Sequence, residues 1–246
     1  MSNLHFAELG NPANPCLVLL HGLAVGHSMW QPELHLFAER YHVLAPDLPG
    51  CAHSAAYGPF TLARAAIAVA DLIQERCTGK VHVCGLSIGA MVAIQLSQIC
   101  PEQIASLILS GAQVHGLWLM KIQRLIFACL PERWLVSSTA KITPSKDPAL
   151  LATLFEEVSL TGKSGILQEN REMEQMDFRP ALNRIELPVL VLCGSKDRAN
   201  LAAAQELGRS LAKAELRIIP EVGHIWNIEK PQLFTEVVCD FVERLK

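Results

Sequence analysis

The sequence of 246 residues predicts an α/β fold with a mostly parallel central sheet and one helical insertion. Short apolar runs rich in β-branched residues alternate with helical patterns, and turn residues separate them. This alternation stops at about Ala112 and resumes after Met176. The length suits one α/β domain carrying an insertion about as well as two small domains. We therefore expect a core of residues 1–111 and 177–246 and an insertion of residues 112–176.

Seven runs have the length and composition of strands. The first two are joined by a turn rich in Gly, Asn and Pro, and the second is apolar on both faces, which is typical of a central strand. Strands that alternate with helices imply right-handed crossovers and chemistry at the carboxyl ends of the strands. The predicted strands are 4–9, 16–20, 41–45, 80–84, 106–110, 188–193 and 216–219.

Capping residues mark the starts of several helices. Ser28 is expected to cap a helix that reaches about residue 39, and Thr61 one that reaches about residue 77. Within the insertion, Asp147 before a proline predicts a helix start, with Gly162 as its stop. Further helices are expected after residue 89, near 199–212 and at the C-terminus, where an apolar face recurs at helical spacing.

The composition restricts the class of protein and of partner. Half of the residues are hydrophobic, 18% are charged, the net charge is −3 and the mean hydropathy is +0.26. No apolar run approaches the ~18 residues of a membrane span, and the first residues do not resemble a signal peptide. We expect a soluble, cytoplasmic protein with a small-molecule ligand rather than nucleic acid as partner. The oligomeric state is not predicted.

The cysteines and histidines show no metal-binding spacing. No Cys-x-x-Cys occurs among the eight cysteines, and the nine histidines show no zinc-type pairs. Seven cysteines fall in apolar patterns and are interpreted as small buried residues in a reducing compartment, while Cys51 lies in a predicted loop. Neither a metal nor a cofactor is expected.

Residues 85–89 read Gly-Leu-Ser-Ile-Gly between a predicted strand and a predicted helix. This is the pattern of a nucleophile elbow, in which a sharp turn strains the serine and leaves no room for neighbouring Cβ atoms. Free N–H groups at the helix start can stabilise an oxyanion. The alternative is an ordinary strand-to-helix turn. The flanking patterns favour Ser87 as a nucleophile.

Five motifs in order make the chain resemble the α/β-hydrolase superfamily, specifically small serine esterase-like members with a helical cap. They are His-Gly at 21–22, Asp-Leu-Pro-Gly at 47–50, the motif at 85–89, Gly-Ser-Lys-Asp at 194–197 and Gly-His at 223–224. The resemblance covers nearly the whole length. It implies the α/β-hydrolase fold, with helices on both faces of the sheet and the insertion as a cap over the active site.

The family order of nucleophile, acid and base is matched by Ser87, Asp197 and His224. An imidazole can take the serine proton and later protonate the leaving group, and a carboxylate can orient that imidazole. Glu221 is the other acid near His224, although its position in the same turn gives it poorer reach. An Asx turn is the structural alternative for Asp197.

Other residues of these motifs have supporting roles by resemblance. The backbone N–H groups of Leu23 and Ile88 would form the oxyanion hole. His21 is expected to shape its loop by hydrogen bonding, and Asp47 lies in a loop that is structural in the family. Ala52 and Ala90 replace glycines that are common in relatives, without touching a reacting group.

A serine nucleophile argues against the dehalogenases and epoxide hydrolases of the superfamily, and the apolar Leu86 argues against carbon–carbon bond hydrolases. The preferred reaction is hydrolysis of a small, largely apolar carboxylic ester through an acyl-enzyme. The alternatives are a thioesterase, a lactonase or a carbon–carbon bond hydrolase on the same triad, and a non-hydrolytic receptor of the same fold. A wide apolar stripe in the insertion either lines the pocket or only docks the insertion. The residues predicted to line the pocket are Trp30, Trp118, Ile122, Trp134 and Trp226.

Overall fold

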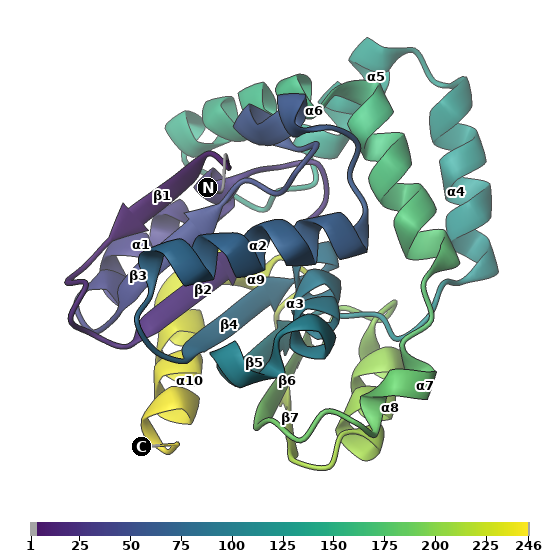
Figure 1. The fold of residues 1–246 in the computed structure, drawn as a ribbon. Helices are drawn as coiled ribbons and strands as arrows, with labels where there is room; N and C mark the ends of the chain where they lie inside the picture. The colour runs from purple at the N-terminus through teal and green to yellow at the C-terminus, as the bar shows by residue number, and fades with distance from the viewer. Residues whose placement is uncertain (1–3, 246) are drawn as a thin grey trace.

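The computed structural model of the protein describes residues 4–245, and within them a sheet of seven strands runs through the molecule (Figure 1). The strand order is β1-β3-β2-β4-β5-β6-β7, with β1 antiparallel to β3 and every other neighbouring pair parallel. This confirms the predicted mostly parallel sheet. The strands are β1 (Phe6–Leu9), β2 (Cys16–Leu20), β3 (His42–Pro46), β4 (Val81–Leu86), β5 (Ile104–Ser110), β6 (Val189–Gly194) and β7 (Ala214–Ile219).

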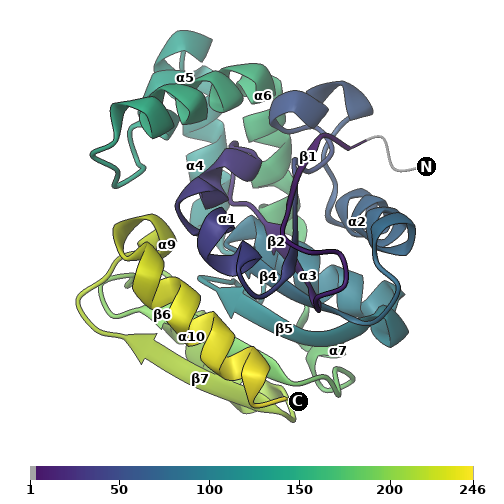
Figure 2. The ribbon, with the colours of Figure 1, turned by 90° about the vertical axis from the view of Figure 1, so that its left-hand side faces the viewer.

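Helices cover both faces of the sheet (Figure 2). Alternate residues of β2 point to opposite faces, so that Val18 and Leu20 pack with one set of helices while Leu17 and Leu19 pack with the other. All four side chains are fully buried, as expected of a central strand. The first set is α2 (Leu62–Arg76), α3 (Ile88–Ile99) and α8 (Leu201–Ser210); the second is α1 (Gln31–Ala38), α9 (Trp226–Glu229) and α10 (Pro231–Glu243).

Two of the three predicted helix caps are present. The Thr61 side chain accepts a hydrogen bond from the Arg64 N–H at 3.0 Å, and Asp147 accepts one from Ala149 at 2.9 Å. Ser28 does not cap α1, because a 3₁₀ helix, η1 (His27–Trp30), precedes it and includes Ser28. The Ser28 N–H instead donates to the side chain of Glu157 in the insertion. The local sequence does not reveal a contact between such distant segments.

The insertion contains α4 (Trp118–Cys129), α5 (Glu132–Ala140) and α6 (Pro148–Gln175), which gather at one end of the sheet (Figure 1). Gly162 was predicted to end a helix. It has φ 63° and ψ 178°, which breaks the helical geometry, but the chain resumes the helix and continues to Gln175. Between the insertion and β6 lies α7 (Arg179–Leu182). Within residues 4–245 no helix has the length and apolar character that crossing a membrane requires.

The remaining short helices are η2 (Ala52–Tyr57) and η3 (Pro101–Gln103). Cys51, just before η2, is fully buried, although the sequence singled it out as the loop cysteine. Cys129, predicted to be buried, is exposed on α4. Both differences arise because the long helix α6 covers the η2 loop, whereas the outer face of α4 has no neighbour among the described residues.

Candidate active site

Ser87 lies where β4 turns directly into α3, as predicted. It has φ 55° and ψ −117°, a backbone conformation that side chains rarely adopt. A Cβ atom on Gly85 would collide with the backbone of residues 89–90, and one on Gly89 would collide with the carbonyl end of β2. The Ser87 N–H donates to the Ser110 carbonyl at 2.8 Å, which fixes the turn against β5. The glycine spacing therefore supplies the room that this strained turn needs.

Asp197 and His224 lie in the turns that follow β6 and β7, and their side chains meet. The Nδ1 atom of His224 is 2.7 Å from Oδ2 of Asp197. The two turns are also joined by their backbones, since the Lys196 N–H donates to the Val222 carbonyl at 2.9 Å. Because β6 and β7 are parallel neighbours, their carboxyl ends bring this acid and this imidazole together.

The space for the imidazole depends on Gly111, the residue directly after β5. Gly111 has φ 61°, and a Cβ atom there would lie 2.6 Å from Cε1 of His224. Its N–H donates to the Leu192 carbonyl at 2.9 Å, which holds the chain close to β6. Residue 111 must therefore stay a glycine for His224 to keep this position. The feature of the sequence that could have revealed this role is a glycine directly after a predicted strand.

Asn200 and Gln113 support the acid, and sequence reasoning missed both. The Asn200 amide donates to Oδ1 and Oδ2 of Asp197 at 2.8 and 2.9 Å. Gln113 in turn donates to the Asn200 side-chain oxygen at 2.6 Å and to the Ala199 carbonyl at 3.0 Å. All the side chains in this chain of bonds are buried. Both carboxylate oxygens of Asp197 are thus held, and one of them faces His224.

Glu221, the other candidate acid, points elsewhere. Its side chain is 85% exposed and pairs with Lys196 at 2.9 Å, so solvent screens its charge. Asp47 is fully buried, but it is not among the residues that line the cavity beside Ser87. Of the three carboxylates considered from sequence, only Asp197 contacts His224 in the described structure.

The loop after β2 carries the predicted oxyanion donor Leu23. His21 is fully buried in this loop: its Nδ1 bonds to the Gly22 carbonyl at 2.8 Å, and its Nε2 accepts from the Leu48 N–H at 2.8 Å. Burial lowers the pKa of His21, outweighing the nearby carboxylate of Asp47. A neutral imidazole fits both bonds, because Nε2 must accept. His21 therefore joins two loops, as expected.

Two buried carboxylates of α6 hold the next part of this loop. Glu169 accepts from the Ala24 N–H at 2.9 Å, and Glu157 accepts from Gly26 at 2.8 Å and from Ser28 at 3.2 Å. Burial raises the pKa of Glu169 to about 8, although its hydrogen bonds oppose the shift. The insertion thus fixes the loop that carries Leu23, and nothing in the local sequence around residue 24 predicts this.

A cavity of about 270 Å³ opens beside Ser87, and His224 and Leu23 also line it. Ile88, the second predicted oxyanion donor, directly follows Ser87 at the start of α3, where N–H groups have no partner within the helix. Most of the remaining wall is apolar, and four of the six methionines contribute to it: Met29, Met91, Met120 and Met173.

None of the five residues predicted to line the pocket does so. Trp30 and Trp226 are fully buried in the core, and the Trp226 N–H donates to the Ser110 hydroxyl at 3.0 Å. Trp118 and Trp134 point outward, 71% and 62% exposed, and Ile122 is 42% exposed. For the residues of the insertion the prediction was wrong because helical spacing identifies an apolar face without showing what it faces. Met120 and Gln123 of α4 reach the cavity instead.

Comparison with known proteins identifies the family of this chain. The sequence model of the alpha/beta hydrolase family matches residues 17–237. A 3-oxoadipate enol-lactonase 2 from Acinetobacter baylyi is 26% identical over 98% of this chain and 93% of its own length. A pimeloyl-[acyl-carrier protein] methyl ester esterase from Nitrosomonas europaea is 27% identical, covering 95% of this chain and 97% of the relative.

A solved structure agrees with these matches. The enol-lactonase from Burkholderia xenovorans LB400 superposes with a TM-score of 0.85 at 25% identity, covering 98% of this chain and 96% of that one. These likenesses confirm the predicted fold and the prediction of an esterase-like hydrolase. Because the family model spans most of the sequence, the chain belongs to the alpha/beta hydrolase family.

Proposed function

We propose that the protein hydrolyses a small, uncharged and largely apolar carboxylic ester through an acyl-enzyme on Ser87. One observation carries the proposal: His224, whose Nδ1 lies 2.7 Å from Oδ2 of Asp197, lines the same cavity as the strained Ser87. A nucleophile, a base and an orienting acid at one cavity are the parts that acyl transfer requires.

The reaction has two halves. His224 takes the proton from the Ser87 hydroxyl as the serine oxygen attacks the ester carbonyl, and the N–H groups of Leu23 and Ile88 stabilise the oxyanion. The tetrahedral intermediate collapses, and His224 gives its proton to the departing alcohol. Water, deprotonated by His224, then releases the acid and restores Ser87. Asp197 holds the Nδ1 proton and stabilises the imidazolium in both halves.

The cavity supports a small uncharged substrate. Its volume of about 270 Å³ lies near the lower limit for small-molecule sites. Among the described residues that line it, none is Lys or Arg, so no permanently charged cation there pairs with an anionic substrate group. Unbranched methionine side chains adapt to an apolar group of variable shape. Lactones remain the second candidate, because one group of relatives bears the name enol-lactonase and a lactone presents the same carbonyl.

The insertion acts as the cap of this site. Seven of the residues that line the cavity come from its three helices and the segments between them. They are Met120, Gln123, Thr139, Ile142, Thr143, Leu154 and Met173. In the proposed complex these residues contact the apolar part of the substrate, so the insertion sets the chain length that fits.

A substrate panel tests the proposal. Purified protein is assayed with p-nitrophenyl esters of increasing acyl length, together with lactone and acyl-CoA substrates, and the same panel is run with Ser87→Ala. We expect many turnovers on short esters, a rise in kcat/KM with each methylene until the cavity is full, and no turnover by the variant. A single slow event per molecule would indicate a receptor, and equal activity of Ser87→Ala would refute the mechanism.

A further inference from the structure

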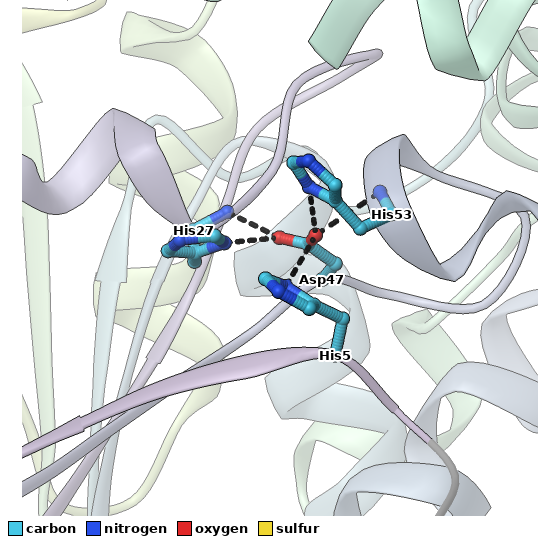
Figure 3. A group of neighbouring side chains, drawn as sticks. All are labelled: His5, His27, Asp47 and His53. Atoms are coloured by element: carbon cyan, nitrogen blue, oxygen red, sulfur yellow. Dashed lines mark hydrogen bonds and ion pairs between the residues drawn. The ribbon is translucent and has the colours of Figure 1, made fainter. Parts of the chain in front are cut away.

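Outside the cavity, three histidines surround one carboxylate (Figure 3). Their Nδ1 atoms all point at Asp47: His27 lies 2.8 Å from Oδ1, and His53 and His5 lie 3.1 and 3.2 Å from Oδ2. The residues come from four places, namely the segment before β1, the start of η1, the end of β3 and η2. None of the four lines the cavity beside Ser87.

The orientation of the Asp47 carboxylate is fixed by hydrogen bonds from the surrounding chain. Its side chain is fully buried, the His27 N–H donates to Oδ1 at 2.6 Å and the His53 N–H donates to Oδ2 at 3.1 Å. Each oxygen therefore has one backbone donor and at least one imidazole. Backbone donors of this kind orient a metal-ligating carboxylate.

We propose that His5, His27, His53 and Asp47 bind one divalent first-row transition-metal ion, with Zn²⁺ as the ion best matched to these donors. Three imidazole nitrogens and one carboxylate oxygen are ligands that zinc accepts in four-coordinate sites. The expectation of no metal rested on sequence spacing, which cannot register ligands brought together from distant segments.

The distances suit such an ion. The four ligand atoms all lie within 4.8 Å of one another. In a tetrahedral zinc site with bonds of about 2.0–2.1 Å, neighbouring ligand atoms are about 3.3 Å apart. The contacts of His5 and His53 with Oδ2 already have nearly that length. The contact of His27 with Oδ1, at 2.8 Å, must lengthen slightly and the imidazoles must move closer to one another. The side chains of His5 and His53, 48% and 36% exposed, have room to turn.

Charge and access also favour a cation. The ion takes the Nδ1 lone pair of each imidazole, so each ring keeps one proton on Nε2, and a ring that was doubly protonated releases its Nδ1 proton to solvent. A second buried carboxylate, Glu157, lies 4.0 Å from Nδ1 of His27 and adds negative charge beside the site. The exposed rings of His5 and His53 give the ion a path in. Once bound, it ties together the start of β1, the loop after β2 and the loop after β3.

Another group in the described structure could compete for the ion. Cys16, His42 and Cys77 also place their ligand atoms within 4.8 Å of one another. In that group, however, His42 Nε2 already bonds to Glu8 at 2.7 Å and the two thiols contact each other at 2.7 Å. The histidine group has a carboxylate held by two backbone N–H groups, which the cysteine group lacks. The test therefore includes a variant of each.

The experiment uses the full chain without an affinity tag, stripped with a chelator and dialysed against Zn²⁺ alone. We expect one Zn²⁺ per chain, a melting temperature several degrees higher with zinc, and visible bands of four-coordinate cobalt when Co²⁺ replaces it. His53→Gln and His5→Gln should each weaken binding at least about tenfold and remove the zinc-dependent rise in melting temperature. His35→Gln, an exposed histidine on α1, should behave as the unchanged protein.

Three results would overturn the site. One is failure to retain zinc at a one-to-one ratio in micromolar zinc. Another is unaltered binding by the His5→Gln, His53→Gln double variant, whose side chains are exposed enough for the fold to tolerate the change. The third is loss of zinc in Cys77→Ser, which would assign the ion to the cysteine group. Ester hydrolysis is measured on the metal-free protein, so a failure of the proposed hydrolase function is distinguished from a failure of the zinc site.

Discussion

Among residues 4–245, two assemblies of histidine and aspartate stand out, and one of them faces the cavity. At the carboxyl ends of β6 and β7, Asp197 holds a single imidazole that lines the cavity with Ser87. At the end of β3, Asp47 holds three imidazoles and is away from the cavity. A short His–Asp distance therefore does not define a catalytic pair. What decides is the group that the imidazole faces on its other side.

The largest expected effect comes from the cavity assembly. Asp197→Asn should lower kcat on the best ester by about 10²–10⁴-fold, because an amide cannot stabilise the imidazolium and favours the wrong tautomer. The unfolding midpoint should change little. Glu221→Gln is the matched control and should leave kcat within about twofold, since that carboxylate is exposed and paired with Lys196. A damaging Glu221→Gln beside a mild Asp197→Asn would reverse the assignment.

The Asp47 assembly should affect folding instead. Asp47→Asn should lower the free energy of unfolding by about 2–4 kcal/mol, since it removes the charge that two backbone N–H groups and three imidazoles surround. Urea unfolding in the presence of a chelator measures this, with Asp71→Asn on the exposed side of α2 as the control. The folded variant should keep kcat within severalfold. A thousandfold loss of kcat without loss of stability would make Asp47 catalytic.

The loop of residues 22–28 joins the two assemblies, since Leu23 lines the cavity and His27 contacts Asp47. Glu169 of α6 holds this loop, and its folded pKa of about 8 lies above its ordinary value near 4.5. Between these values the folded state binds the extra proton, so Glu169 makes the protein less stable as pH rises from about 5 to 8.

Glu169→Gln keeps an acceptor for the Ala24 N–H and removes the titration. At pH 8 the variant should be more stable than the wild type by on the order of 1–3 kcal/mol, and the difference should shrink toward pH 5. Urea unfolding from pH 5 to 9 measures it, with the exposed Glu156→Gln as the control. If the free energy of unfolding changes with pH equally in the wild type and in Glu169→Gln, the pKa of Glu169 is not raised in the folded state.

The smallest expected effect comes from removing the hydrogen bonds that hold the Asp197 carboxylate. Asn200→Ala removes two hydrogen bonds to Asp197, each about 2.8–2.9 Å, and should lower kcat about tenfold with little change in KM. Asn183→Ala, exposed after α7, is the control. If kcat is unchanged while the melting temperature falls, Asn200 supports the fold and not the orientation of the acid.

The parts of the molecule that local patterns encode could be predicted from the sequence. The apolar runs gave the parallel sheet, because a strand buried on both faces must be apolar at every position. Thr61 and Asp147 cap their helices, because a cap depends only on neighbouring residues. The glycines around Ser87 reveal its turn for the same reason.

The rest depends on contacts between distant segments. Residues 24 and 169 are far apart in the sequence, as are residues 5 and 53, so neither contact leaves a local signal. Trp118 was misplaced because an apolar stripe on α4 does not show which neighbour it faces, and it faces outward. Gln113 and Asn200 belong to no sequence motif, and their role is evident only from their hydrogen bonds to each other and to Asp197.

Covalent labelling tests the central claim most directly. The protein is incubated with a fluorophosphonate, and the adduct is located by intact mass and peptide mapping. The account predicts one adduct per chain on Ser87, loss of ester hydrolysis in proportion to labelling, and no adduct on a folded Ser87→Ala variant. An adduct on any other residue of the active protein, or persistent labelling and hydrolysis by Ser87→Ala, would contradict it.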